Sequence, residues 1–325
     1  MMGESLKPES LKFAFLAVIL SCSAHAQLTN RQPAWYLPVS EDCRLFVQEF
    51  GGGQETIVVV HGGWGAEHSY LLDAFKGVDL RYRLVFYDQR GSLLSPCPTS
   101  SISVDKHVED LERLRKALGL ERLNIVAHSM GTFLAMSYLQ QHLERVKGLV
   151  LLGAVAPKTP TTDEEKAFAK EREQAARQFL DRPEIAAEQE REIPKDKGPR
   201  SPKEETNFWR IKFAGVNIYH VERWREVEGG RAFYNADAGN AAAKTMPTPF
   251  DFTPALKAHQ CPIWVMDGDH DFLDMGAVKF QRETAAIATV HFSILQDAGH
   301  SAWIDAPEQF QDLLLRAIDN TIKCR

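Results

Sequence analysis

The segment 124–132 constrains the fold of this chain more than any other. Its apolar run I-V-A breaks at H-S-M-G, and a helix-like amphipathic stretch follows. A serine at the tip of a sharp strand-to-helix turn needs a strained backbone and small residues two positions before and after it, here Ala127 and Gly131. Such a turn would expose the hydroxyl of Ser129 beside the N–H of Met130 and the start of a helix. We therefore predict that Ser129 is a nucleophile; a serine that merely caps a helix is the alternative.

Short apolar runs alternate with helix-like segments along the first half of the chain. Residues 57–60 form a continuous apolar run, typical of a strand buried on both faces of a parallel sheet, and residues 104–118 place apolar side chains at helical spacing. Runs at 263–266 and 290–295 continue the pattern near the C-terminus. This alternation predicts an α/β fold, with a mostly parallel twisted sheet and helices on both faces.

The composition changes between these two groups of strands. Residues 159–202 are rich in Glu, Lys, Arg, Ala and Gln, whereas residues 207–234 are rich in aromatic side chains. An insertion that returns to the sheet at its next strand must lie over the carboxyl edge of that sheet. We therefore expect residues 157–250, the inserted segment, to form a helical cap over the predicted nucleophile. The expected core is then 27–156 and 251–325.

A glycine cluster, H-G-G-W-G at 61–65, follows the buried run at 57–60. Glycines at that place allow the backbone to approach a ligand and to present N–H groups, as the second donor of an oxyanion hole requires. We assign that donor to the N–H of Gly63 and the first donor to the N–H of Met130. A plain turn before a helix is the alternative.

Three tryptophans are candidates for substrate binding. Trp64 lies in the glycine cluster, and Trp209 and Trp224 lie in the aromatic part of the inserted segment. Aromatic side chains supply large apolar contact areas to small-molecule pockets, although packing inside the fold is the simpler role for each of them. We expect all three to line the substrate pocket.

An acid and a histidine follow the last two predicted strands. The run D-G-D-H-D comes directly after 263–266, and His300 lies after 290–295. A carboxylate that holds a histidine in its working tautomer completes a nucleophilic triad. We choose Asp271 for this role, with Asp269 as the second choice. The order Ser, Asp, His along the chain is the one expected for a serine at such a turn.

Another charged motif, D-Q-R-G at 88–91, ends the predicted strand at 84–87. Charged pairs near sheet ends usually serve structure. We therefore interpret Asp88 and Arg90 as a buried ion pair or turn network that fixes the loop beside the pocket.

The bulk properties exclude several classes of partner. The chain has 325 residues and a formal net charge of −6, so it lacks the overall basic character expected for binding to nucleic acid or to an anionic membrane. Neither the G-x-G-x-x-G nor the G-x-x-x-x-G-K-[ST] nucleotide-binding fingerprint occurs. The expected chemistry needs no cofactor and no metal, and the expected partner is a small-molecule or short-peptide substrate. The sequence does not indicate an oligomeric state.

Residues 1–26 have the layout of a secretory signal peptide. Lysines precede the apolar run 13–20, which is too short to span a bilayer, and A-H-A follows, ending at Ala26. We expect cleavage near Ala26 and export to a periplasmic or extracellular compartment, without stable membrane insertion afterwards. Lipid attachment at Cys22, whose preceding residues resemble a bacterial lipoprotein box, and an uncleaved anchor are the alternatives.

Four cysteines remain beyond the predicted signal peptide, namely Cys43, Cys97, Cys261 and Cys324. An even number in an oxidising compartment allows one or two disulfides, and the sequence does not indicate their pairing. The spacing is too irregular for a metal site. We expect Cys261, which precedes an apolar strand, to be a buried small hydrophobic residue.

Taken together, the motifs resemble the α/β-hydrolase fold family across essentially the whole chain after residue 26. The motifs are H-G-G-W-G at 61–65, D-Q-R-G at 88–91, A-H-S-M-G at 127–131, G-D-H-D at 268–271, and G-H at 299–300 with P-E-Q-F at 307–310. The pairing of H-G-G with Y-D-Q-R-G looks most like the proline iminopeptidase branch, serine aminopeptidases with a helical cap. The A-H-S-M-G turn is similar to that of general esterases and lipid hydrolases.

The resemblance implies a serine hydrolase that works through an acyl-enzyme, and more narrowly an aminopeptidase of the proline iminopeptidase type. A carboxylesterase or lactonase acting on small esters is one alternative, and a catalytically silent small-ligand binding protein is another. An aminopeptidase must recognise a free amine. The inserted segment offers acids for this purpose that could equally be solvated surface: Glu204, Glu205, Glu222, Glu226 and Glu228.

Overall fold

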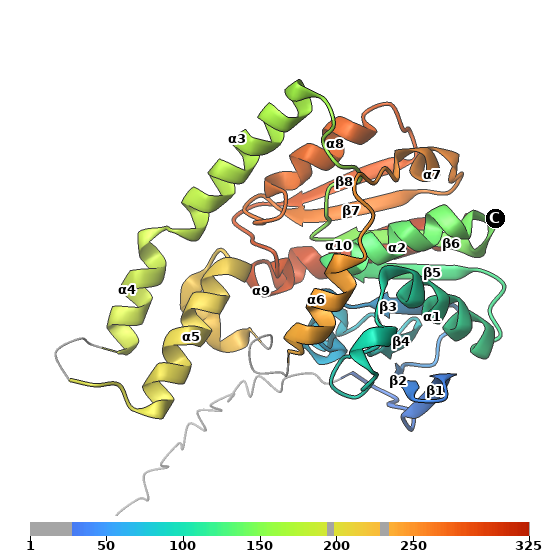
Figure 1. Ribbon diagram of the computed structural model, residues 1–325, viewed down its shortest axis with the longest axis horizontal. Coiled ribbons are helices and arrows are strands. Elements are labelled where there is room, and N and C mark those ends of the chain that lie inside the picture. Colours follow the sequence, from blue (N-terminus) through green and yellow to red (C-terminus); the bar gives the residue numbers. More distant parts are fainter. Residues whose placement is uncertain (1–27, 194–197, 228–233, 325) are drawn as a thin grey trace, which may run out of the picture.

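The computed structural model describes residues 28–193, 198–227 and 234–324 (Figure 1). The predicted signal peptide, with Ala26 and the alternative lipid site Cys22, lies outside the described residues, as does Glu228. Within these ranges, no helix combines the length and the apolar character needed to cross a membrane.

The described strands form one eight-stranded sheet in the order β1-β2-β4-β3-β5-β6-β7-β8. All neighbouring pairs from β4 onward are parallel, whereas β1–β2 and β2–β4 are antiparallel. The α/β prediction with a mostly parallel sheet is therefore confirmed. The strands are β1 (Trp35–Ser40), β2 (Cys43–Phe50), β3 (Thr56–Val60), β4 (Arg83–Tyr87), β5 (Leu123–His128), β6 (Val146–Leu152), β7 (Ile263–Gly268) and β8 (Val290–Leu295).

The chain reverses its direction of winding at β3. From β3 it moves to β4 on one side, and β5 then pairs with β3 on the other side, with Val60 opposite Ala127. In open parallel sheets, the crevice at such a switch point, outside the carboxyl ends of the strands, is where ligands bind. The glycine cluster and the turn at Ser129 follow these two adjacent strands, so the topology brings both to one edge.

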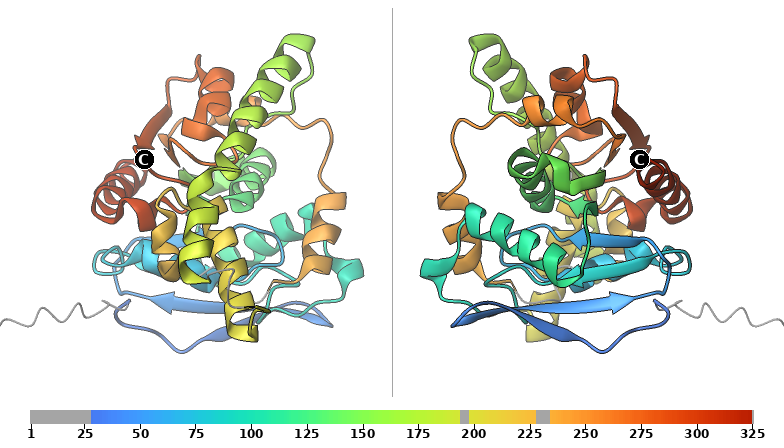
Figure 2. Two further views of the ribbon diagram at one scale, coloured as in Figure 1. Left: turned by 90° about the vertical axis from the view of Figure 1, so that its left-hand side faces the viewer. Right: turned by 90° about the vertical axis from the view of Figure 1, so that its right-hand side faces the viewer.

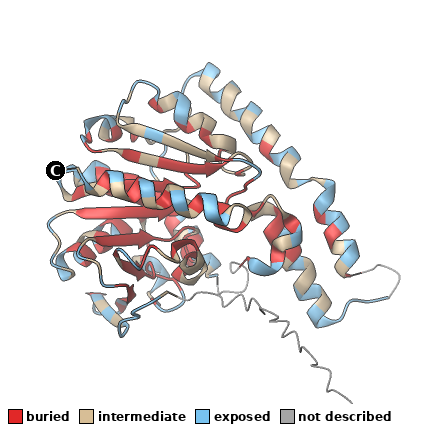
Figure 3. Cartoon of the chain, turned by 180° about the vertical axis from the view of Figure 1, so that it is seen from behind, coloured by how far each residue is buried: buried red, intermediate tan, exposed pale blue. Residues whose placement is uncertain are grey.

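Alternate residues of the buried strands pack into two separate apolar cores, one on each face of the sheet. In β3, Val58 and Val60 join one core, whereas Ile57 and Val59 join the other. Helices cover both faces, and Figure 2 shows the layers edge-on while Figure 3 shows the buried central strands. The first core packs against α1 (Val104–Ala117), α2 (Met130–Gln141), α7 (Thr253–Ala258) and α8 (Val278–Thr284), and the second against η1 (His68–Phe75), α9 (Ala302–Asp305) and α10 (Pro307–Ile322).

The inserted segment contributes only helices to the described structure before α7. It runs through α3 (Asp163–Leu180), α4 (Pro183–Glu192), α5 (Pro202–Asn217), η5 (Val221–Glu226) and α6 (Ala236–Lys244). Capping boxes start α3 at Thr162 and α5 at Ser201. The helices α3, α4 and α5 lie along one side of the molecule (Figure 1), and apolar side chains of α4, α5 and η5 join the second core.

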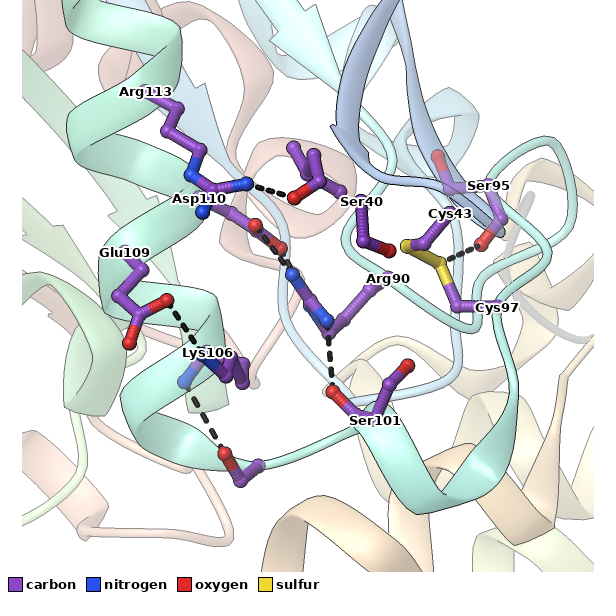
Figure 4. A network of polar contacts seen from close by, with 12 residues as sticks. Ser40, Cys43, Arg90, Ser95, Cys97, Ser101, Lys106, Glu109, Asp110 and Arg113 are labelled. Carbon is purple, nitrogen blue, oxygen red and sulfur yellow. Dashed lines mark hydrogen bonds and ion pairs between the residues drawn. A yellow bond between two sulfur atoms is a disulfide. The ribbon is translucent and has the colours of Figure 1, made fainter.

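Two disulfides link distant parts of the described chain. Cys43 of β2 bonds to Cys97 in the loop after β4 (Figure 4), and Cys261, just before β7, bonds to Cys324 after α10. Cys261 is buried, as expected, but it forms a disulfide and is not simply a small hydrophobic residue. Its partner is 63 residues away in sequence, and the two Cα atoms lie 5.6 Å apart, a separation that only the folded chain brings about.

The D-Q-R-G motif forms two networks instead of one pair. Arg90 makes a buried bidentate ion pair with Asp110 of α1, with N–O distances of 2.7 and 2.6 Å, and donates to the carbonyl of Ser101 (Figure 4). Asp88 instead accepts from the backbone N–H of His68 and of Leu94. Asp88 and Arg90 therefore both fix loops, as the structural interpretation requires. They do so through different partners and do not pair with each other.

Candidate active site

Ser129 lies at a sharp turn between β5 and α2, with φ 55° and ψ −129°. A non-glycine residue at positive φ costs on the order of 1–3 kcal/mol and persists only where its surroundings hold it. Here the N–H of Ser129 donates to Leu152 and its carbonyl accepts from Thr132. A Cβ on Gly131 would lie 2.5 Å from the carbonyl oxygen of Val60, so glycine is required at that position.

The glycine cluster after β3 lies against the side of this turn. A Cβ on Gly62 would lie 2.5 Å from the Cβ of Ser129, and Gly63 adopts a φ of +54°. Met130 is the first residue of α2, where backbone N–H groups have no partner within the helix. Gly62, Gly63 and Ser129 border the same cavity. The N–H groups of Gly63 and Met130 therefore lie on the two segments that flank the serine.

The loops after β7 and β8 bring an acid and a histidine together. Nδ1 of His300 donates to Oδ2 of Asp271 over 2.7 Å, and Oδ1 of Asp271 accepts from the N–H of Leu273. Both side chains are buried. Asp269, the second choice, instead contacts the ring of His270 and the N–H of Ala298. Of the two acids, the structure pairs Asp271 with His300, and this bond leaves Nε2 of His300 available for a proton.

A third carboxyl, that of Asp267, lies buried behind this pair. Burial, followed by the nearby charge of Asp271, raises the pKa of Asp267 well above its ordinary value, although its Oδ1 accepts from the N–H of Ala154. A neutral Asp267 avoids placing two negative charges side by side in the protein interior.

Ser129 and His300 both border one cavity of about 610 Å³. Most of its wall is apolar or aromatic, a character typical of small-molecule sites. Residues from the core and from the inserted segment line it together: Gly62, Gly63, Ala66, Glu67, Tyr70, Asp73, His128, Ser129, Phe213, Val216, Asn217, Glu226, Val227, Tyr234, Phe272, His300, Ser301, Trp303 and Ile304.

None of the three tryptophans predicted to bind substrate borders this cavity. Trp64 is buried against His107 and Phe133 in the first core. Trp224 is buried and donates to Glu188, whereas Trp209 is 57% exposed. These side chains pack the fold or face solvent, so the expectation that they line the pocket is corrected.

The aromatic side chains that do line the cavity come mainly from the core. Phe272 directly follows Asp271, and Trp303 lies three residues after His300. Their closeness in sequence to the predicted acid and base was the signal that could have identified them. Tyr70 had a weaker signal of the same kind, because it lies five residues after the glycine cluster at 61–65, in the 3-10 helix that follows this cluster.

Tyr70 and His128 join three loops of the site by hydrogen bonds. The N–H of Gly62 donates to the Tyr70 oxygen over 2.8 Å, and that hydroxyl lies 2.7 Å from Nδ1 of His128. Nε2 of His128 lies 3.2 Å from the carbonyl oxygen of His300. A carbonyl only accepts, so Nε2 carries the proton and Nδ1 accepts from Tyr70. Burial lowers the pKa of His128 well below its ordinary value and raises that of Tyr70, so both remain neutral.

The predicted amine-binding acids of the inserted segment are mostly engaged elsewhere. Glu204 closes the capping box of α5, Glu205 pairs with Arg200, and Glu222 lies beside His220. Glu226 does border the cavity, but it pairs with Arg223. The structure therefore brings one of the four described acids to the cavity wall.

One group among the described residues, Glu67, His68 and Asp88, is close enough to hold a metal ion. Its atoms already have protein partners. Asp88 accepts from the ring of His68 at 2.7 Å and from two backbone N–H groups, and Glu67 accepts from Ser69. The closeness of these three side chains is therefore explained by hydrogen bonds that fix the loops, without a metal ion.

Comparison with known proteins identifies the family and supports the fold. A family model described as alpha/beta hydrolase fold matches residues 55–307. The chain is 37% identical over 122 residues to a proline iminopeptidase from Neisseria gonorrhoeae and 30% identical over 123 residues to one from Saccharolobus solfataricus. These matches cover 36% and 37% of this chain, and they span only 39% and 40% of the relatives' own length.

Solved structures show the same fold over most of the chain. A proline iminopeptidase-related protein from Thermus thermophilus has a TM-score of 0.65 at 24% identity, covering 90% of this chain and 99% of its own. An esterase from Exiguobacterium antarcticum also has a TM-score of 0.65, at 16% identity, covering 88% of this chain and 100% of its own. At these identities the likeness establishes the architecture and not the reaction.

Proposed function

Because the chain belongs to the alpha/beta hydrolase fold family, we propose that it is a serine hydrolase in which Ser129 is the nucleophile, His300 the general base and Asp271 the acid that orients it. The observation that carries the proposal is the 2.7 Å bond between His300 and Asp271 beside a cavity that the strained Ser129 also borders. A nucleophile, a base and an orienting acid are what acyl transfer to serine requires.

The reaction begins when Nε2 of His300 takes the hydroxyl proton of Ser129 as its oxygen attacks the substrate carbonyl. The N–H groups of Gly63 and Met130 stabilise the resulting oxyanion, and loss of one such donor typically costs about 3 kcal/mol of transition-state stabilisation. His300 then protonates the leaving group. Water attacks the acyl-enzyme, giving one proton to His300, which returns it to Ser129. Asp271 stabilises the cationic form of His300 throughout.

The narrower proposal is an aminopeptidase of the proline iminopeptidase type. It is supported by the curated relatives, whose matches of 30–37% identity span about two-fifths of their length. A carboxylesterase or lactonase is the second candidate. It is favoured by the predominantly apolar cavity wall, because a small ester needs no charged group to bind it. A silent binding protein remains the third, and the shared presence of serine, histidine and acid at one cavity weighs against it.

The test is a panel of amino-acid arylamides, including prolyl, and short to medium 4-nitrophenyl esters, assayed with the wild type and Ser129→Ala in parallel. Serine-dependent cleavage of arylamides that N-acetylation of the substrate blocks would establish the aminopeptidase. Serine-dependent cleavage of esters alone would establish the esterase. Hydrolysis that Ser129→Ala retains would refute the assignment of the nucleophile.

We also propose that the protein is exported after cleavage near Ala26, with lipid attachment at Cys22 as the alternative. Two disulfides among the described residues support an oxidising compartment, because disulfides are rare where thiols are kept reduced. Mass spectrometry of the mature N-terminus tests this. A free N-terminus near residue 27 supports cleavage, a lipidated N-terminal cysteine supports the alternative, and an intact N-terminus contradicts both.

A further inference from the structure

Three carboxylates of the described residues border the cavity that contains Ser129, and one of them differs from the other two in its ionic partners. Asp73 forms an ion pair with Lys76 at 2.6 Å, and Glu226 forms one with Arg223 at 2.6 Å. Among the described residues, no lysine or arginine lies within ion-pair distance of Glu67, although its side chain is only 5% exposed. Within the described ranges, the basic group at ion-pair distance from it is Nδ1 of His68, 3.8 Å away.

His68 does not neutralise Glu67, because its Nδ1 lies 2.7 Å from Asp88. From the part of the chain that the structure describes, Glu67 accepts two hydrogen bonds, both from Ser69. Oε2 accepts from the backbone N–H over 2.6 Å, and Oε1 accepts from the hydroxyl. A carboxylate has about four lone-pair sites, so two remain for another donor. Glu67 caps the first turn of η1, whose N–H groups help to hold the carboxylate in place. This turn does not supply a cation.

Glu67 also belongs to the segment that would hold the reacting carbonyl. It lies four residues after Gly63 and three before Tyr70, and all three border the cavity. A substrate whose carbonyl oxygen is held by Gly63 and Met130 therefore lies in the cavity that Glu67 also borders. A buried, unpaired carboxylate at such a place favours a substrate that brings its own positive charge.

We propose that Glu67 binds a protonated amine on the acyl part of the substrate, so that the preferred substrates are aminoacyl amides or esters and not their uncharged analogues. The proposal rests on the hydrolase function given above. It assigns amine recognition to the loop after β3 instead of to the glutamates of the inserted segment. A charge-assisted hydrogen bond at this site accounts for a preference of about 10-fold to 100-fold over the uncharged analogue.

The test uses two substrates that differ only in the amine, prolyl 4-nitroanilide and cyclopentanecarbonyl 4-nitroanilide, together with the corresponding benzyl esters. The wild type is compared with Glu67→Gln, which keeps an oxygen that can accept from Ser69 but removes the charge. Glu173→Gln is the matched control, because it removes a carboxylate of α3 that pairs with Arg177 and does not border the cavity. Glu67→Asp restores the charge, and thermal unfolding confirms that each variant is folded.

We expect Glu67→Gln to lower kcat/KM for the aminoacyl compounds about 10-fold to 100-fold, mainly through KM, and to leave the cyclopentanecarbonyl compounds within about twofold. Glu173→Gln should change neither, and Glu67→Asp should recover part of the loss. Equal losses for both substrates in Glu67→Gln would show that Glu67 only supports the loop. An unchanged preference would show that the amine binds elsewhere. Either result overturns the proposal.

Binding to a Ser129→Ala variant separates this proposal from the hydrolase function. Calorimetry with prolinamide and cyclopentanecarboxamide should show tighter binding of prolinamide, and Glu67→Gln in the same background should remove the difference. If no substrate is hydrolysed but this difference is present, the hydrolase proposal fails and the cation site stands. If hydrolysis depends on Ser129 but the two amides bind equally, the cation site fails alone.

Discussion

The edge of the sheet at Ser129 and the inserted segment face the same cavity but are built differently. Around Ser129, several buried polar groups are held by short bonds, as in the Asp271–His300 pair and in the bond between His128 and the half-buried Tyr70. In the inserted segment most ion pairs lie at the surface, and α3 has a single buried residue, Ala176 (Figure 3). Surface ion pairs contribute little to stability, whereas a buried polar group that loses its partner is costly.

This difference indicates how the two regions divide the work. The sheet edge holds the reacting groups in place through buried hydrogen bonds, so a substitution there is expected to displace them. The inserted segment supplies part of the cavity wall through α5, with Phe213, Val216 and Asn217. We therefore expect substitutions at the edge to reduce the rate of the chemical step, and substitutions in the inserted segment to change substrate binding or nothing.

The largest effect should come from the triad acid. Asp271→Asn should lower kcat about 10⁴-fold, because an amide no longer holds His300 in the working tautomer or stabilises its cation. Asp269→Asn is the matched control, since that carboxylate bonds to His270 and Ala298. Steady-state kinetics on the best substrate of the panel measures both. The reverse order of effects would mean that the acid is misassigned.

Adding one carbon beside the serine should have the next largest effect. The Cβ of Gly62→Ala would meet the Cβ of Ser129 at 2.5 Å and the carbonyl oxygen of His128 at 2.9 Å. The loop that carries Gly63 must then move, and we expect kcat to fall about 100-fold, the cost of misplacing one oxyanion donor. Gly52→Ala, where nothing lies within 4 Å, should be neutral. An active Gly62→Ala enzyme would contradict the described loop.

Removing the hydroxyl of Tyr70 should have a moderate effect. Tyr70→Phe leaves the N–H of Gly62 and Nδ1 of His128 without a partner, so we expect kcat to fall about tenfold with KM nearly unchanged. Tyr138→Phe is the control, because it removes an equally short bond, to Glu112, away from the cavity. Equal losses of activity in the two variants would reduce the role of Tyr70 to general stability.

The smallest effects should lie in the inserted segment. Phe213→Ala should raise KM by a few-fold and leave kcat unchanged, because the side chain borders the cavity but not the serine turn. Trp209→Ala on the same helix should stay within about twofold in both constants, since its side chain is 57% exposed and does not line the cavity. A large loss of kcat in either variant would contradict the claim that the inserted segment affects substrate binding and not the chemical step.

The sequence predicted the parts of the molecule that local chemistry determines. Continuous apolar runs specified the buried parallel strands, and the small residues around Ser129 specified the turn. The edge strand β1 was missed, because its buried residues are few and Pro38 interrupts the pattern. The two disulfides, each closing more than 50 residues, could not be paired without the fold.

The candidate site was also predictable only where residues follow strands directly. Asp271 and His300 follow strands directly, so the parallel sheet brings them to one edge. The cavity wall depends instead on how helices dock, which periodicity does not specify. For this reason Trp64 and Trp224 were assigned to the pocket although both are buried in the apolar cores. The Tyr70–His128 bond spans 58 residues and depends on the same docking.

The most direct test of the account is labelling with a fluorophosphonate, followed by peptide mass spectrometry to locate the adduct. We predict a single adduct on Ser129, formed by the wild type and by Asp269→Asn, and formed far more slowly by Asp271→Asn. An adduct on Ser301, which borders the same cavity, or no adduct in the folded wild-type protein, would contradict the assignment of Ser129 as the nucleophile.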